Sequence, residues 1–427
     1  MKNLKTTLPA SAAVLALMMT GCTGIAPTSS EGDDGAGAQI RYLIEQPEDA
    51  ESIDLINADL ATFEEQNPDI DVELEVMPLD SMRTVLQTQL RSGEGPDVFS
   101  WGSGPGYAGA LAEAGLLYDL TDAYEENDWP VYDFAKERVT SDGKVIGIPG
   151  DIETIGLFYN KTIFDELGIA QPENLSDLEA AASQIDQAGM TPFAISDKEG
   201  WQGGHLLSMA LSSRIGPDGM DSLLAGETPW SSPDVVAALE TWNEFRTTGH
   251  MTEFPTSLSY DDANALFYSG EAAILPTGSW LAPEIENGVD FEVGYVPFPA
   301  EDSTGIFSGG LGSGPLVSAS TANPEAAIAF LDYLMTPEHG RWTIENQSTI
   351  PPFPVDTEGV DTSPLFAQVV TDSAKIADGT GEFGYNIDVL ATDVFNNAMI
   401  NGIQAMLTDQ KTAEQVAQDL EAAFQQG

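Results

Sequence analysis

The side chains that most often carry out catalysis are few in this sequence, and none stands in a catalytic pattern. The three histidines, His205, His250 and His339, form no H-E-x-x-H motif and no i, i+4 pair, so they predict no zinc site. Each is expected at the surface or at a helix end. The chain has one cysteine and no G-x-S-x-G sequence, which disfavours cysteine and serine hydrolases. These residues therefore predict neither a metal nor a cofactor.

The single cysteine stands at the end of a pattern typical of export. Lys2 and Lys5 precede an apolar run over residues 10–19, and Met19-Thr20-Gly21-Cys22 follows directly. A run of about ten residues is too short to span a bilayer, so residues 1–21 are interpreted as a signal peptide. The sequence before Cys22 resembles a bacterial lipobox, which predicts lipidation of Cys22; a simple signal peptide with a coincidental cysteine is the alternative. Residues 22–38 are small and polar and are expected to form a flexible spacer.

One glycine-rich segment matches a nucleotide-binding pattern. Gly104-Pro105-Gly106-Tyr107-Ala108-Gly109 follows a predicted strand and fits G-x-G-x-x-G. Pro105 would disturb the tight turn around a phosphate, and an exported protein meets little dinucleotide. We therefore interpret the segment as a plain loop between a strand and a helix.

The charge balance excludes another class of partner. Sixty-nine acidic residues face fifteen Lys and Arg, which gives a formal net charge of -54. Such a surface repels phosphate backbones and anionic lipid headgroups, so no nucleic acid is expected as a partner. Pairs of carboxylates, the machinery of glycosidases, cannot be recognised by counting among so many acids.

Hydrophobic patterns predict the elements that must position a site. Residues 40–44, 70–76 and 97–101 have strand patterns, with helices expected over 53–66 and 81–92. This alternation predicts an α/β fold with parallel strands. Further strands are predicted over 143–148, 154–159, 271–275 and 291–296, and further helices over 175–188 (begun by Ser176), 233–247, 324–335, 391–407 and 412–424. The length of 427 residues fits two α/β lobes better than one.

Eight short motifs follow one another along the chain: GEGPDVF (93–99), GKVIGIP (143–149), LFYNK (157–161), FYSGEAAI (267–274), GSW (278–280), VPFP (296–299), NPEAA (323–327) and TAEQV (412–416). In order and spacing they resemble the family 1 extracellular solute-binding proteins of carbohydrate ABC importers. The resemblance covers about residues 39–425, and its specificity lies in the combination of motifs.

The resemblance implies a two-lobed periplasmic-binding-protein fold with a hinge and a ligand cleft between the lobes. Lobe 1 would hold residues 39–150 and 310–345, and lobe 2 residues 152–308 and 350–427, with crossings near Gly150, Gly309 and Ile350. The implied function is not enzymatic: the protein captures a sugar or oligosaccharide outside the cytoplasm by hinge closure and delivers it to ABC permease subunits. It would be a monomer, attached to the outer face of the cell membrane only through its lipid anchor.

Site residues also come from the resemblance. Trp101 and Trp280 resemble stacking positions of the maltodextrin-binding branch, and flat rings suit the C–H faces of sugars. Glu153 falls where that branch has a carboxylate that accepts sugar hydroxyls, and Trp201 lies in a segment of loop composition. Weaker candidates, taken from element ends expected to face the cleft, are Gln46, Gly310 and Tyr385. Trp242, with Leu239 and Phe245 at helical spacing, is interpreted as a packing face.

Other interpretations stay open at this point. Gly102-Ser103-Gly104-Pro105-Gly106 replaces more polar residues of the maltodextrin-binding branch, so maltodextrin itself is not implied. Polyols and polyamines are alternative ligands. A lipid-anchored carbohydrate-active enzyme would form products from oligosaccharides, and a cell-surface adhesin would bind polymer without closing.

Overall fold

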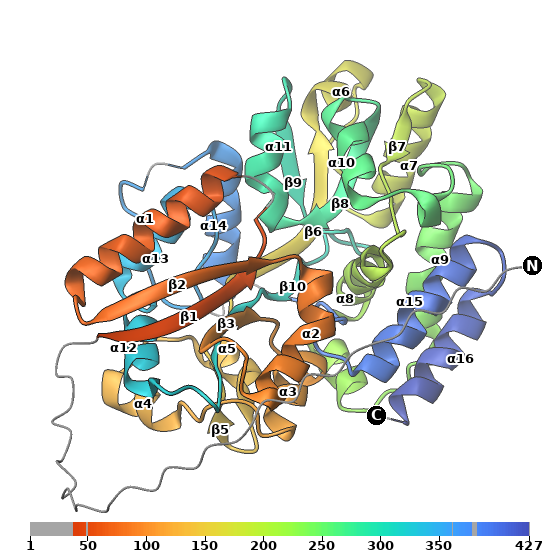
Figure 1. Cartoon of the computed structure of the whole chain (residues 1–427). Coiled ribbons are helices and arrows are strands. Elements are labelled where there is room, and N and C mark those ends of the chain that lie inside the picture. The colour runs from red at the N-terminus through yellow and green to blue at the C-terminus, as the bar shows by residue number, and fades with distance from the viewer. Residues whose placement is uncertain (1–36, 48–49, 361, 378–381, 427) are drawn as a thin grey trace, which may run out of the picture. The chain divides into compact units, whose positions relative to one another are not determined.

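The computed structural model describes residues 37–47, 50–360, 362–377 and 382–426 (Figure 1). The predicted signal peptide, Cys22 and all but the last two residues of the predicted spacer lie outside these ranges. The described chain is α/β, as predicted, and is built on two main sheets. Within the described ranges, the helices are all too short or too polar to cross a membrane.

The first sheet contains the predicted parallel strands. Its order is β11-β3-β1-β2, formed by β1 (Ala38–Glu45), β2 (Ile70–Met77), β3 (Val98–Trp101) and β11 (Gly314–Val317). β1 pairs in parallel with both β2 and β3, and α1 (Ala50–Gln66) and α2 (Leu79–Ser92) make the crossovers that parallel strands require. The antiparallel β11 then brings a distant part of the chain beside β3.

The core under the first sheet joins α1 to a helix far along the chain. α12 (Pro324–Leu334) begins where predicted, and its Phe330 meets Phe63 of α1 edge to face with ring centroids 5.2 Å apart. Both rings are fully buried. The contact fixes α12 against the parallel strands of this sheet.

The second sheet is centred on one long buried strand. Its strands are β6 (Ile152–Asn160), β7 (Thr191–Phe193), β8 (Ala272–Gly278) and β10 (Ser308–Leu311) in the order β10-β6-β8-β7, and β9 (Val293–Val296) also pairs with β6. Every residue from Thr154 to Asn160 is buried. The strands predicted over 154–159, 271–275 and 291–296 therefore all lie in this sheet, with shifted ends.

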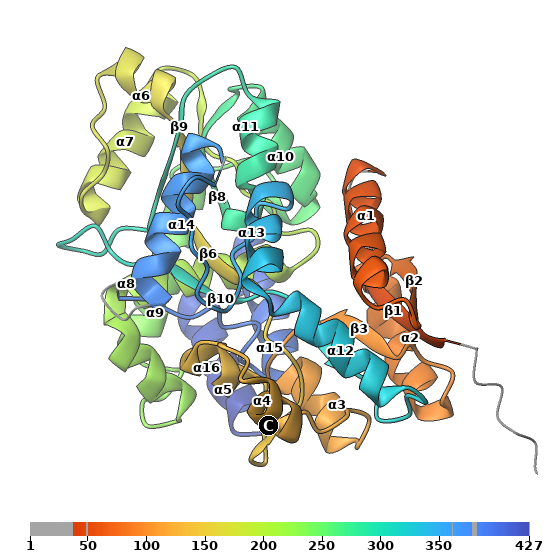
Figure 2. The same cartoon turned by 90° about the vertical axis from the view of Figure 1, so that its left-hand side faces the viewer.

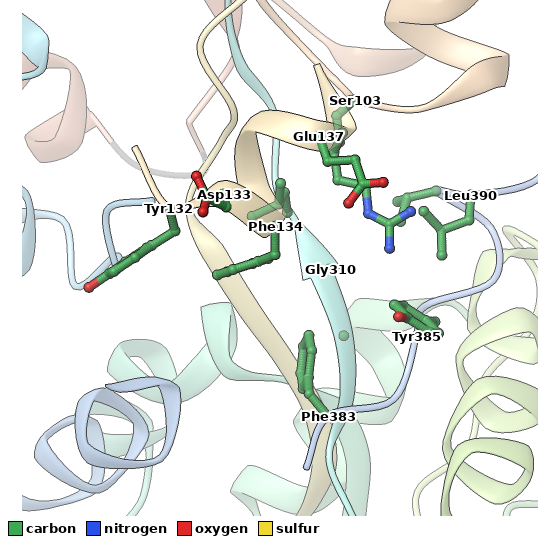
Figure 3. A pocket seen from close by; sticks show the side chains of 13 residues that line it. Ser103, Tyr132, Asp133, Phe134, Glu137, Gly310, Phe383, Tyr385 and Leu390 are labelled. Atoms are coloured by element: carbon green, nitrogen blue, oxygen red, sulfur yellow. The ribbon is translucent and has the colours of Figure 1, made fainter. Parts of the chain in front are cut away.

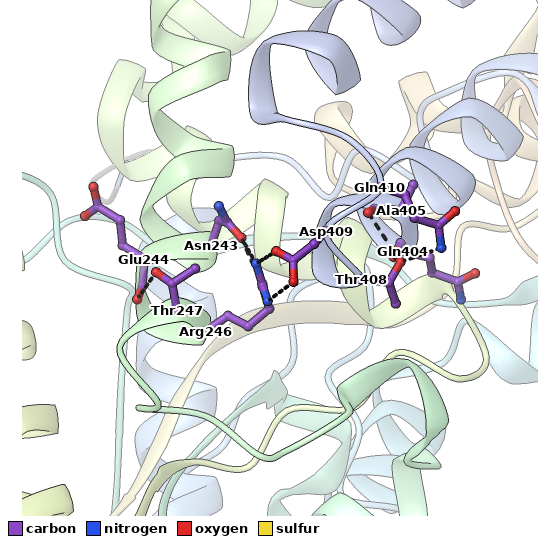
Figure 4. Close-up of polar contacts among 9 residues, drawn as sticks. All are labelled: Asn243, Glu244, Arg246, Thr247, Gln404, Ala405, Thr408, Asp409 and Gln410. Carbon is purple, nitrogen blue, oxygen red and sulfur yellow. Dashed lines mark hydrogen bonds and ion pairs between the residues drawn. The ribbon is translucent and has the colours of Figure 1, made fainter.

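Four helices pack together beside the second sheet: α8 (Trp201–Leu224), α9 (Pro233–Thr247), α15 (Asp393–Leu407) and α16 (Ala413–Phe424), neighbours in both views (Figures 1 and 2). Trp242 of α9 is buried among them, which confirms it as a packing residue, and its Nε1 donates to the Leu206 carbonyl at 2.7 Å. Arg246 of α9 reaches the Asp409 carboxylate just beyond α15 (Figure 4). Segments remote in sequence thus hold one another in place.

The remaining elements are short or lie at the edges of the two sheets. They are η1 (Pro105–Gly109), α3 (Ala110–Glu113), α4 (Thr121–Asn127), α5 (Asp133–Arg138), β4 (Thr140–Ser141), β5 (Lys144–Val145), α6 (Lys161–Leu167), α7 (Leu175–Gln187), η2 (Pro255–Ser257), α10 (Tyr260–Tyr268), η3 (Ser279–Leu281), α11 (Ala282–Gly288), α13 (Pro337–Asn346) and α14 (Pro364–Ala377).

Three further predictions of local structure were wrong. Of the strand predicted over 143–148, only β5 pairs, with β4, while Ile148 donates its N–H to the Pro315 carbonyl. The helix α7 is capped by the side chain of Asn174, which accepts the N–H of Asp177, so Ser176 lies within its first turn. The glycine-rich segment predicted as a loop forms the π-helical turn η1.

The segment around Trp201 differs most from prediction. Instead of a loop, Trp201 begins α8, the longest helix described, which kinks at Gly216. Gly203, part of the segment whose composition suggested a loop, and the next residue, Gly204, serve close packing: a Cβ on Gly203 would lie 2.8 Å from Ile403, and one on Gly204 2.8 Å from Met399, both of α15. Glycine here indicates helix contact rather than a loop.

The chain changes from one sheet to the other at Gly150, at Gly312–Ser313 and between α13 and α14. The first two segments cross backbone to backbone, because a Cβ on Gly150 would lie 2.1 Å from the Gly312 carbonyl oxygen. Ser308–Leu311 pairs with β6, so Gly310 lies in the second sheet and not, as predicted, in lobe 1. The glycines of Gly309-Gly310 and of Gly312-Ser313-Gly314 would both let the backbone change direction. Because Gly309-Gly310 is hydrogen-bonded to β6 as part of β10, the chain crosses at Gly312–Ser313 instead. The other lobe boundaries stay a prediction.

Candidate functional site

A cavity of about 930 Å³ brings together four of the predicted site residues. Trp101 comes from the end of β3 in the first sheet, and Glu153 from β6 in the second. Trp201 begins α8, and Trp280 lies in η3 just after β8. Elements of both sheets therefore contribute to the cavity, which we call the main cavity.

One wall of the main cavity is aromatic and is held by its own contacts. The Trp201 ring lies 4.8 Å from Tyr260 and 4.9 Å from His205, and His205 lies 5.6 Å from Trp280, centroid to centroid. The indole Nε1 of Trp280 donates to the Tyr260 hydroxyl at 3.1 Å. That hydroxyl also lies 2.8 Å from Oγ1 of Thr277. We call Trp201, His205, Tyr260 and Trp280 the aromatic wall.

The opposite wall is built differently. Trp101 is 8% exposed, since most of its ring belongs to the core of the first sheet. It meets Tyr107 of η1 edge to face at 5.9 Å. The exposed Arg83 of α2 reaches the Tyr107 hydroxyl at 3.4 Å. We call Trp101, Tyr107 and Arg83 the β3 wall.

Carboxyl groups also line the main cavity. Glu153 is half-buried, and burial together with the charges of Asp151, Asp388 and Glu45 raises its pKa to about 8. Burial also raises the pKa of Asp151, which directly precedes β6, to about 6. A protonated Glu153 both donates and accepts a hydrogen bond, which suits a hydroxyl-rich ligand.

His205 and its partners were missed by sequence reasoning. The prediction of a surface or helix-end position was wrong, because His205 is 7% exposed and its Nε2 lies 3.2 Å from Asn386 Nδ2 and 3.7 Å from Asp388 Oδ2. His339 does lie at a helix end, in the first turn of α13, where its Nε2 is 3.1 Å from Oδ2 of the buried Asp59. Only tertiary structure brings such distant residues together.

Three weaker candidates lie outside the main cavity. Gln46 is exposed and its backbone N–H donates to the Met77 carbonyl. Gly310 and Tyr385 line a second cavity of about 550 Å³, where Phe134 and Phe383 surround them (Figure 3). The Arg138 guanidinium lies 5.2 Å from the Tyr385 ring centroid. Leu311 and Val389 line both cavities and separate them.

Within the described part of the chain, no three His, Cys, Asp or Glu side chains are grouped as a metal site requires. The arrangement offers flat rings on one wall and donors and acceptors between the walls, which is the chemistry of a site for a small polar molecule with apolar faces.

Comparison with known proteins gives consistent results. The model of a family described as bacterial extracellular solute-binding protein matches residues 45–341. The multiple sugar-binding protein of Streptococcus mutans is 29% identical over 286 residues, which cover 64% of this chain and 66% of that protein. The xylose/arabinose-binding protein of Haloferax volcanii is 26% identical over 58% of this chain and 56% of its own length. The matched regions thus span 66% of the first relative and 56% of the second.

Solved structures share the fold. A chitin oligosaccharide binding protein superposes with a TM-score of 0.78 at 22% identity, covering 90% of this chain and 98% of its own. A solute-binding protein in complex with raffinose gives a TM-score of 0.72 at 22% identity, covering 91% and 98%. At this identity the likeness establishes the architecture, and it confirms the predicted fold class.

Proposed function

Because the chain belongs to the family of bacterial extracellular solute-binding proteins, we propose that it captures a sugar or oligosaccharide in the main cavity and delivers it to an ABC importer in the membrane. The observation that carries this proposal is the convergence of Trp201, Tyr260 and Trp280 with Glu153 on one cavity formed by both sheets. Relatives named as sugar-binding proteins support the ligand class.

Recognition would divide between rings and polar groups. The exposed faces of Trp201 and Trp280 would bury the C–H face of a pyranose, a contact worth about 1 to 3 kcal/mol. Glu153, Asn386 and Asp388 would exchange hydrogen bonds with its hydroxyls. Because Trp280 already donates to Tyr260, its ring is oriented before the ligand arrives, which reduces the entropy cost of binding.

Capture would involve movement of one lobe against the other. We keep the predicted lobes, which are residues 39–150 with 310–345 and residues 152–308 with 350–427. The one change is that the whole of 308–311 is assigned to lobe 2. The crossings at Gly150 and Gly312 carry glycines where backbone dihedrals change at little cost. Closure would bring the β3 wall down onto a ligand resting on the aromatic wall.

The protein would act outside the cytoplasm as a monomer, in keeping with its family. Lipidation of Cys22 would hold it at the outer face of the cell membrane, while residues 23–38 act as a spacer. Replacing Cys22 with Ser should release the protein without changing its sugar affinity. A mature N-terminus other than a lipidated Cys22, found by mass spectrometry, would refute the anchor.

The alternative of a carbohydrate-active enzyme predicts product formation, whereas a binding protein returns its ligand unchanged. We propose the absence of enzymatic activity because relatives and neighbours are named as binding proteins. Incubation with maltotriose, xylotriose, raffinose and chitotriose, followed by chromatography, should leave each sugar intact. Hydrolysis by the wild type that is lost in Glu153→Gln would contradict the proposal.

The direct test is tryptophan fluorescence and calorimetry with the same four sugars, together with a polyol and a polyamine. At least one sugar should bind with a dissociation constant in the micromolar range or tighter. Binding of the polyol or polyamine alone would move the function to another ligand class. Binding of none of the sugars would overturn the proposed carbohydrate function.

A further inference from the structure

The main cavity has an unequal set of charges. Among the described residues that line it, four are acids, namely Glu45, Glu153, Glu284 and Asp388, and Arg83 is the one Lys or Arg. Even with Glu153 protonated, the acids outnumber the guanidinium. The cavity therefore presents a negative potential to anything that enters it.

The positions of these charged side chains add to the negative potential of the cavity. Arg83 is exposed and lies against Tyr107 on the β3 wall. Glu153 and Asp388 are partly buried, and each lies within the electrostatic range of the other. Asp388 also faces Nε2 of His205 at 3.7 Å. Glu153 and Asp388 thus lie where water screens their charges less, whereas Arg83, like Glu45 and Glu284, is exposed to water that screens its charge more.

A helix N-terminus beside the cavity does not offset this potential. α8 begins at Trp201, and its first free N–H groups would attract an anion. The carboxyl group of Asp197 takes one of these N–H groups, because its Oδ1 accepts the N–H of Gly203 at 2.8 Å. An acidic side chain therefore already lies at this helix end and reduces its attraction for an anion.

We infer that the main cavity selects uncharged or cationic carbohydrates and rejects acidic ones, with Asp388 as the main specificity-determining residue and Glu153 as a second acid beside it. The inference rests on the proposed function and names the class of sugar within it. A uronic acid or sugar phosphate would bring a negative charge beside Asp388, which is only partly exposed to water, and such like-charge contact is a repulsive element that opposes the wrong ligand.

The experiment compares sugars that differ in one group. Maltotriose and raffinose are each prepared in three forms, with one primary hydroxyl intact, oxidised to the carboxylate, or replaced by an amine. Calorimetry at pH 7 should show that the carboxylate form of whichever parent binds is at least tenfold weaker, about 1.4 kcal/mol. The amine form should bind as tightly as the parent or more tightly.

Variants then assign the effect to residues. Glu153→Gln with Asp388→Asn keeps the shape of both side chains and should reduce the discrimination against the carboxylate form to less than threefold. Glu179→Gln, which removes one exposed charge on α7 outside the cavity, should leave the discrimination unchanged. Circular dichroism confirms folding, and if the double variant does not fold, the wild-type comparison alone decides.

Each outcome has a separate meaning. Equal or tighter binding of the carboxylate form by the wild type would overturn this inference while the proposed function stands. Equal loss of discrimination in Glu179→Gln and in the double variant would show a general effect of net charge and would also overturn it. Binding of neither parent, with no binding across the panel of the proposed function, would overturn both.

Discussion

The two walls of the main cavity are built on different principles. In the aromatic wall, Trp201, Tyr260 and Trp280 are partly exposed and hold one another through ring contacts and the Trp280–Tyr260 hydrogen bond. In the β3 wall, Trp101 is nearly all core, and only its edge reaches the cavity. The difference indicates that the aromatic wall provides affinity, whereas the β3 wall mainly holds the first sheet together and covers the ligand.

Trp101→Ala should give the largest effect, and on stability rather than affinity. Removing a buried ring leaves a cavity in the core of the first sheet, which should lower the free energy of unfolding by about 3 to 5 kcal/mol. Urea denaturation measures the loss, with calorimetry on the folded fraction for affinity. A loss of affinity at unchanged stability would reverse the assignment of the walls.

Trp280→Ala should show the opposite pattern. Its ring is partly exposed in the aromatic wall, so affinity for the sugar that binds best should fall by about 1 to 3 kcal/mol, or roughly ten- to a hundredfold. The melting temperature should change little. Phe254→Ala, which removes an exposed aromatic residue outside the cavity, is the matched control and should bind as the wild type does.

Tyr260→Phe tests whether the aromatic wall is oriented in advance. Loss of the hydroxyl leaves Trp280 Nε1 without this acceptor and should weaken binding by about 1 kcal/mol. Calorimetry of the variant measures this loss. Unchanged affinity would mean that ring packing alone orients Trp280.

Glu153→Gln should have the smallest effect near neutral pH. The folded-state pKa of Glu153 is raised to about 8 from its ordinary 4.5, so glutamine imitates the protonated side chain and affinity at pH 6 should change by less than about threefold.

The same pKa shift predicts how stability depends on pH. The unfolded chain releases this proton near pH 4.5 and the folded chain near pH 8. The contribution of Glu153 to stability is therefore complete below pH 4.5 and is lost as pH rises through 8. The melting temperature of Glu153→Gln relative to that of the wild type should therefore rise between pH 5 and pH 8.5. The same difference in melting temperature at both pH values would contradict the raised pKa of Glu153.

The sequence predicted the order of β1, α1, β2, α2 and β3 because each has a clear hydrophobic period. Trp101, Glu153 and Trp280 were chosen from the resemblance and Trp201 from the composition of its segment, and all four line one cavity. His205, Tyr260 and Asp388 were missed, since their meeting depends on how α8, α10 and a late segment pack. Tyr385 lies in a coil segment whose course no local sequence pattern determines, and it lines the second cavity.

The two cavities give the account its most direct test. A crystal structure of the protein with whichever of the four panel sugars binds most tightly should show a pyranose ring against Trp280 or Trp201 and a hydroxyl within 3.2 Å of Glu153. A sugar bound instead in the second cavity beside Tyr385 and Phe383, with the aromatic wall empty, would contradict the central claim.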